Sequence, residues 1–107
     1  LDGPGHQLEI QTGLKPASLY LYEASVTGTE TALLAAAAAS RPAEIRHAAC
    51  EPHVVELCHF LARLGVGISG AGTSTIQVDG GGALRGTEHR LWGDYIEAGS
   101  WAVVAAV

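Results

Sequence analysis

The stretch 51–80 limits the possible folds more than any other part of the chain, because it predicts a helix followed directly by a β-hairpin. Pro52 suits the first helical position, and Gly65 stands where a left-handed helix cap belongs. Between them, apolar side chains recur at spacings of three and four, which gathers them on one face of a helix. These side chains are Val54, Leu57, Cys58, Leu61 and Leu64. We therefore expect an amphipathic helix over 52–64 that packs against a sheet.

Two short runs of alternating apolar residues follow this helix. The first holds Val66 and Ile68, the second holds Ile76 and Val78, and the sequence Gly-Ala-Gly-Thr at 70–73 separates them. Such alternation is typical of strands with one buried face, and a short glycine-rich spacer is typical of a hairpin turn. The rest of the chain must supply what packs beside this helix–hairpin unit.

Residues on both sides of the unit predict further elements. Alternating runs predict strands over 8–12 and 18–22, and we also expect strands over 43–48 and 88–92. Thr27 and Glu30 have the spacing of a capping box, and the alanine-rich run behind them predicts a helix over 28–40. Asp94 and Glu97 repeat that spacing ahead of a small-residue helix over 95–107.

These elements contain an internal repeat. Strand, polar loop, capping box and small-residue helix occur at 19–39 and again at 89–107. A repeat of this length suggests compact supersecondary units rather than a solenoid of short repeats. We expect a mixed α/β (α+β) fold forming a single partial domain over 1–107. In it, 18–80 is a complete βαβαββ unit, 88–107 is the first strand and helix of the next, and all the helices lie on one side of the sheet.

Charge and cysteine content exclude several classes of protein. A formal net charge of −5 argues against nucleic acid as the main partner. Two cysteines in 107 residues are too few for a disulfide scaffold and fit a reducing, cytoplasmic setting. The longest apolar run, 32–39, is too short to span a bilayer, so no membrane partner is expected. Because the sequence has no Met and stops inside an apolar run, we expect a piece of a longer protein.

Other candidate sites are weaker. Two cysteines and two histidines form a C-x₂-H-x₄-C-H pattern that matches no usual zinc spacing; they are Cys50, His53, Cys58 and His59. A nucleophilic pair of Cys50 and His53 lacks an evident third group to orient it. The glycines of 70–73 lie between two strands, which argues against a dinucleotide fingerprint. We therefore predict no metal and no cofactor.

Four motifs resemble those of the enolpyruvyl transferases, and most closely the branch of the family that acts on UDP-N-acetylglucosamine. They are SVTGTE at 25–30, AACEP at 48–52, GAGT at 70–73 and DYIEAG at 94–99. The family shows SVGATE, AAREP, GAGT and PDRIEAGT at matching distances. The resemblance implies an inside-out barrel made of βαβαββ units. It also implies transfer of enolpyruvyl from phosphoenolpyruvate to a sugar hydroxyl, with loss of phosphate.

The same resemblance implies a substrate-binding loop in this chain. In similar enzymes, the residues that match Glu23, Ala24, Ser25 and Val26 contact the UDP-sugar, and Thr27 is their neighbour. A loop that enters a helix N-terminus suits a diphosphate, because it presents unpaired N–H groups and the positive end of the helix dipole. The alternative is that Ser25 and Thr27 only cap the helix.

Three acidic residues are further candidates, Glu51, Asp94 and Glu97, although a carboxylate at a helix start is also favourable without any catalytic duty. The family's reactive cysteine, its lysine and the aspartate thought to act as base lie outside this sequence. We therefore place no catalytic residue in this chain and expect it to be inactive alone.

Several departures from the family pattern leave alternatives open. Cys50 and Tyr95 stand where the family has arginines, which removes cationic help for anionic substrates. Thr27 replaces a glycine, and 92–93 replace the residues ahead of Asp94. Three alternatives therefore remain open: a divergent paralogue, the sister family that acts on shikimate 3-phosphate, and a non-catalytic binding or structural module. The A-x-x-E-P and D-x-I-E-A-G patterns argue against the sister family. We also expect self-association, because Ile96, Trp101 and other apolar residues of 95–107 lack the rest of their unit.

Overall fold

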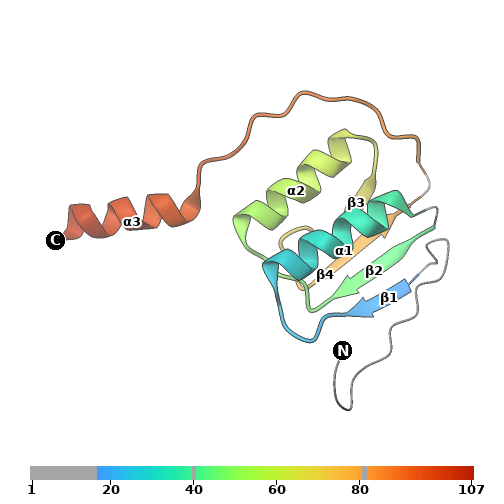
Figure 1. Ribbon diagram of the computed structural model, residues 1–107, viewed down its shortest axis with the longest axis horizontal. Coiled ribbons are helices and arrows are strands. Elements are labelled where there is room, and N and C mark those ends of the chain that lie inside the picture. Colours follow the sequence, from blue (N-terminus) through green and yellow to red (C-terminus); the bar gives the residue numbers. More distant parts are fainter. Residues whose placement is uncertain (1–16, 40, 81) are drawn as a thin grey trace, which may run out of the picture.

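The computed structural model describes residues 17–39, 41–80 and 82–107, which form a four-stranded sheet and three helices (Figure 1). The predicted strand over 8–12 lies outside these residues. In chain order the elements are β1 (Ala17–Tyr20), α1 (Val26–Ala38), β2 (Ala43–Arg46), α2 (Pro52–Arg63), β3 (Gly67–Ser69), β4 (Thr75–Asp79) and α3 (Tyr95–Ala106). This is an α+β arrangement, as the sequence predicted, and its first six elements follow the order βαβαββ.

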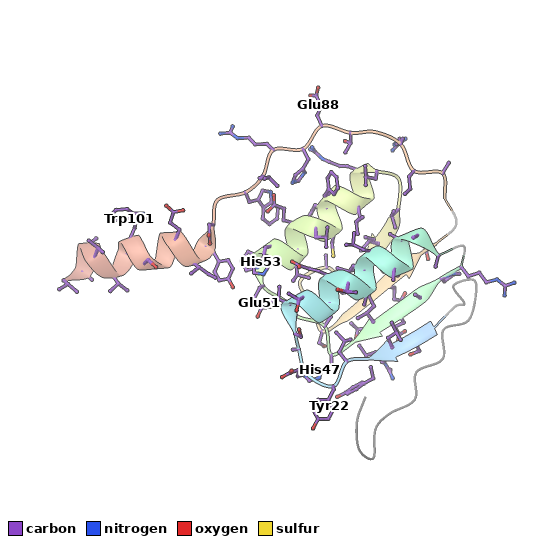
Figure 2. All side chains as sticks on the ribbon, viewed as in Figure 1. Tyr22, His47, Glu51, His53, Glu88 and Trp101 are labelled. Carbon is purple, nitrogen blue, oxygen red and sulfur yellow. The ribbon has the colours of Figure 1, made fainter. Side chains whose placement is uncertain are left out.

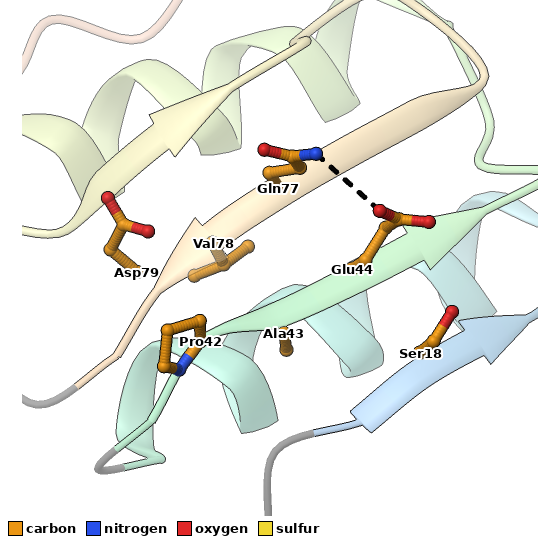
Figure 3. Close-up of a pocket in the computed structure, with 7 residues that line it drawn as sticks. All are labelled: Ser18, Pro42, Ala43, Glu44, Gln77, Val78 and Asp79. Carbon is orange, nitrogen blue, oxygen red and sulfur yellow. Dashed lines mark hydrogen bonds between the residues drawn. The ribbon is translucent and has the colours of Figure 1, made fainter.

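The sheet has the strand order β1-β2-β4-β3 and mixes two kinds of pairing. β1 and β2 are parallel, whereas β4 runs antiparallel to both of its neighbours. Helices α1 and α2 cover one face of the sheet (Figure 1). The other face carries polar side chains such as Ser18, Glu44 and Gln77, which explains why water can cover it (Figure 3).

The core lies between the two helices and the inner face of the sheet. Its fully buried side chains include Leu33 from α1, Val54 from α2, Ile45 from β2, and Ile76 and Val78 from β4. The predicted stripe on α2 is confirmed: Val54, Cys58 and Leu61 are buried, and Leu57 and Leu64 pack against the core at half burial.

The predicted hairpin is confirmed as β3 and β4. Gly70 and Gly72 both have φ of 82°, a conformation that side-chain-bearing residues rarely adopt. A Cβ on Gly70 would collide with the Thr75 carbonyl oxygen, so glycine is required there for two reasons. Gly65 has φ of 107° directly after α2, in agreement with the expected cap.

The predicted start of α1 was wrong by two residues. Ser25, not Thr27, is the N-cap: its backbone is extended and its Oγ accepts a hydrogen bond from the Gly28 N–H at 3.1 Å. Thr27 lies inside the first turn, where its carbonyl accepts from the Thr31 hydroxyl. The sequence offered two hydroxyl residues two positions apart, and Ser25 has the geometry that reaches a free N–H of the first turn.

Two further expectations fail in the C-terminal part. The strand predicted over 88–92 does not form, because that segment runs beside α2 and pairs with no strand of the described sheet. α3 begins after Asp94 as predicted, since the Asp94 carboxylate accepts from the N–H groups of Ile96 and Glu97. The expectation that all the helices lie on one side of the sheet is wrong for α3. This helix projects away from the sheet and buries none of its residues (Figure 1).

Candidate functional site

The carboxyl ends of β1 and β2 lie at one edge of the sheet, because these two strands are parallel and in register. Each strand is followed by a short loop and then by a helix, so the N-terminal ends of α1 and α2 open at this same edge (Figure 1). Ligands of open α/β sheets bind beyond the carboxyl ends of their parallel strands. This edge is therefore where the predicted binding loop should act, and we call it the carboxyl edge.

The predicted loop residues are placed at the carboxyl edge. Glu23 and Ala24 are exposed, Ser25 and Val26 are half-buried, and Thr27 is exposed in the first helical turn. The Ser25 N–H bonds back to the Glu23 carbonyl at 2.7 Å, which makes the loop tight. The N–H groups of the first turn of α1 have no partner within the helix, apart from the one that Ser25 caps.

Thr29 joins the two loops of the carboxyl edge, and the sequence analysis missed it. Its fully buried hydroxyl donates to the Ser25 carbonyl at 2.7 Å and accepts from the Ala49 N–H at 2.9 Å. A polar residue on the buried face of a small-residue helix, three and four positions before Ala32 and Leu33, was the signal that could have found it.

His47 is the second residue that the sequence analysis missed. It has φ of 59°, the one positive value among the described non-glycine residues. Its Nδ1 donates to the Leu21 carbonyl at 2.9 Å, and its ring lies 5.5 Å from that of Tyr20. Figure 2 shows His47 close to Tyr22, whose side chain is exposed at the same edge. No sequence signal marks a histidine for this conformation.

Glu51 stands at the N-cap position of α2, but its side chain makes no capping bond. Its Oε2 atom is buried and has no hydrogen-bond partner among the described residues. Glu51 therefore makes no capping bond, although its position at the start of α2 still suits a negative charge.

Asp94 and Glu97 lie at the start of α3. Asp94 caps α3, and Glu97 accepts from the Trp101 indole N–H at 3.5 Å. Asp94 also lines a cavity of about 350 Å³ between the start of α2 and the start of α3, together with Pro52, His53 and Tyr95. Asp94 thus both caps α3 and lines a cavity, whereas Glu97 only accepts a hydrogen bond within α3.

A larger cavity, of about 460 Å³, lies on the open face of the sheet (Figure 3). It is a shallow surface with both polar and apolar side chains, on which the Gln77 amide donates to the Glu44 carboxylate at 3.5 Å. No predicted site residue lines it; its residues are Ser18, Pro42, Ala43, Glu44, Gln77, Val78 and Asp79.

The cysteines and histidines of the C-x₂-H-x₄-C-H pattern do not form a metal site among the described residues. Cys58 is buried in the core and Cys50 is exposed, and burial raises the pKa of the Cys58 thiol. Among the described residues, no group of three or more His, Cys, Asp or Glu side chains is placed to hold an ion. Across 17–39, 41–80 and 82–107, no helix has the length and apolarity needed to cross a bilayer.

The sequence profile of EPSP synthase (3-phosphoshikimate 1-carboxyvinyltransferase) matches residues 5–107. The chain belongs to this family of carboxyvinyltransferases, which confirms the resemblance carried by the four motifs.

Three relatives with high identity to this chain carry the name of one kind of enzyme. A UDP-N-acetylglucosamine 1-carboxyvinyltransferase of Treponema denticola is 48% identical over 83% of this chain. Proteins with the same name in Coxiella burnetii and Shewanella pealeana are 45% and 40% identical over 92% and 100% of the chain. The chain spans 21%, 23% and 28% of the length of these three relatives.

Proposed function

We propose that this chain is a segment of an enolpyruvyl transferase that moves enolpyruvyl from phosphoenolpyruvate to a hydroxyl of UDP-N-acetylglucosamine, in cytoplasmic synthesis of peptidoglycan precursors. Membership of the carboxyvinyltransferase family and the names of the relatives support the reaction and the substrate. The described βαβαββ order supports the inside-out barrel unit of that family.

Within that enzyme, we assign the loop of Glu23, Ala24, Ser25, Val26 and Thr27 to the UDP-sugar. The single observation that carries this assignment is the N-terminus of α1, which opens at the carboxyl edge beside that of α2. Two helix N-termini offer N–H groups and positive dipole ends to a diphosphate. Because Cys50 and Tyr95 replace arginines, the described residues bind the anion mainly through backbone groups.

The loop assignment can be tested on this chain by nuclear magnetic resonance. Titration with UDP-N-acetylglucosamine should shift the backbone amides of 25–29, while those of Asp79 and Gly80, at the opposite end of the sheet, stay in place. Ser25→Ala should weaken binding, whereas Thr31→Val, on an exposed hydroxyl one turn further on, should not. Unchanged amides at 25–29 in millimolar UDP-sugar would remove the assignment.

Parallel titrations separate the alternatives. Shifts caused by shikimate 3-phosphate and not by the UDP-sugar would favour the sister family. We also expect the chain alone to release no phosphate from phosphoenolpyruvate and UDP-N-acetylglucosamine, because the family's catalytic groups lie outside it. Phosphate release would contradict that placement. A reading frame around this coding sequence without the family's cysteine loop would favour a non-catalytic module.

A further inference from the structure

We propose that the Glu56 carboxylate is a clasp that fixes the segment 82–94 along α2 and thereby holds the start of α3 beside the start of α2. One carboxylate oxygen, Oε1, accepts two hydrogen bonds from this segment. The Nε2–H of His89 donates to it at 2.9 Å and the backbone N–H of Trp92 at 2.7 Å. A side chain on α2 thus holds two points of the segment three residues apart.

The clasp is sheltered from water, although the segment around it is exposed. The side chains of His89 and Glu56 are only 10% and 14% exposed, whereas every other residue of 82–94 is exposed. The Phe60 ring meets the His89 ring edge-on, with 5.5 Å between their centroids. Hydrogen bonds to a charged, sheltered acceptor contribute more than those in open water.

The other hydrogen bonds that hold the segment lack a charged acceptor that is sheltered from water. Near its start, the Arg85 N–H donates to the Leu64 carbonyl, and the Arg63 guanidinium donates to the Glu88 carbonyl at 2.8 Å. Each of these contacts is a single hydrogen bond, and the one between Arg63 and Glu88 is exposed. At its end, the Tyr95 ring stacks on that of His53 at 5.4 Å, where α3 starts. That stack lies beyond the clasp and reports on whether the clasp holds.

The hydrogen bond from His89, followed by that from the Trp92 N–H, lowers the pKa of Glu56. Because the pKa is lowered in the attached state, the contribution of the clasp is present above the ordinary glutamate pKa, about 4.3. It is lost as the pH falls through the lowered value. Glu56 lines one groove with the ionisable side chains of Glu30, His53 and His89. It lines a second cavity with those of His53, Asp94 and Tyr95.

His89 is oriented by this pairing. A carboxylate can only accept, so Nε2 carries the proton that it shares with Glu56. The other ring nitrogen, Nδ1, is buried and has no partner among the described residues. The ring is therefore held by one polar contact, and removal of Glu56 leaves two buried ring nitrogens without partners.

Three variants test the clasp. Glu56→Ala removes both hydrogen bonds, and Glu56→Gln keeps the shape of the side chain but removes its charge. Glu88→Gln is the matched control, because the Glu88 side chain is exposed and only its backbone carbonyl accepts the hydrogen bond from Arg63. Two readouts are the exchange rate of the Trp92 amide and the nuclear Overhauser contacts between the His53 and Tyr95 rings. Protection of the Ile45 and Ile76 amides verifies that each variant is folded.

We expect Glu56→Ala to raise the Trp92 exchange rate roughly tenfold or more and to abolish the ring contacts. Glu88→Gln should change neither. Glu56→Gln, which removes the charge and keeps the shape, should weaken the ring contacts at neutral pH to the level that the unmodified chain shows in acid, and acid should weaken them no further. Ring contacts that survive in folded Glu56→Ala would overturn the proposal, and so would ring contacts of the unmodified chain that acid leaves unchanged. No substrate is needed, so the proposal stands or fails independently of the proposed function.

Discussion

Helices α1 and α3 begin in the same way, but α1 packs against the core and α3 does not. Each starts after an extended residue whose side chain caps the first turn, Ser25 in one and Asp94 in the other. Each is rich in small apolar residues. Yet α1 buries Thr29, Ala32, Leu33 and Ala36, and α3 buries nothing. Local sequence therefore decides where a helix begins, and a second surface decides whether it contributes to the core.

The distribution of apolar residues also separates the two helices. The buried residues of α1 recur at spacings of three and four and face the sheet. The apolar residues of α3 extend around the helix, including Ile96, Trp101, Val103 and Val104, each more than 60% exposed. A helix that is apolar on all sides is typical of one buried by several neighbours.

The largest expected effect is the loss of a core side chain from α1. Leu33→Ala should reduce the free energy of unfolding by about 2–5 kcal/mol, because Leu33 is fully buried and its removal leaves a cavity. Chemical denaturation measures it. Val103→Ala in α3, compared where the chain is monomeric, should change it by less than about 0.5 kcal/mol. Similar losses for the two variants would erase the contrast between the helices.

The next effect concerns association through α3. We propose that the chain forms a homodimer or larger assembly that covers α3 or an open sheet edge, since burying one large apolar side chain contributes roughly 1.5–3 kcal/mol. Trp101→Gln should weaken association at least about tenfold in sedimentation experiments, the factor that corresponds to 1.4 kcal/mol. A clean monomer at tens of micromolar before and after the change would end this idea.

A buried hydroxyl in α1 comes third. Thr29→Val keeps the shape but leaves the Ala49 N–H without its acceptor, which should cost about 1–3 kcal/mol in unfolding free energy. Thr31→Val, which removes an exposed hydroxyl bonded to the Thr27 carbonyl, is the control and should cost less. Equal costs would mean that Thr29 does not join the two loops of the carboxyl edge.

The smallest effect compares the two caps. Ser25→Ala and Asp94→Ala should each weaken their helix by about 1 kcal/mol. The Ser25 variant should lower the denaturation midpoint, because α1 is part of the core. The Asp94 variant should reduce helicity by circular dichroism and leave that midpoint unchanged. A shifted midpoint for Asp94→Ala would show that α3 is coupled to the core.

Sequence reasoning succeeded where local pattern and burial agree. The stripe of α2, the hairpin glycines and the Asp94 cap each follow from one short stretch, and each was found. It failed where a contact distant in sequence decides. A short strand was predicted over 88–92, but the Glu56 side chain 33 residues before His89 holds this segment beside α2. His47 in its left-handed conformation and the Thr29 bridge over 20 residues were missed for the same reason.

The strand order β1-β2-β4-β3 has a consequence for the chain during its synthesis. β4 lies between β2 and β3, yet of the four strands it leaves the ribosome last. Until residue 79 has emerged, Ile45 lacks its cross-strand neighbour Ile76, and Leu33 and Val54 lack the surface that Ile76 and Val78 provide. The nascent chain must therefore hold three strands and two helices in an incomplete state, with apolar faces open to other molecules. The final five-residue strand closes the sheet from its middle rather than from its edge.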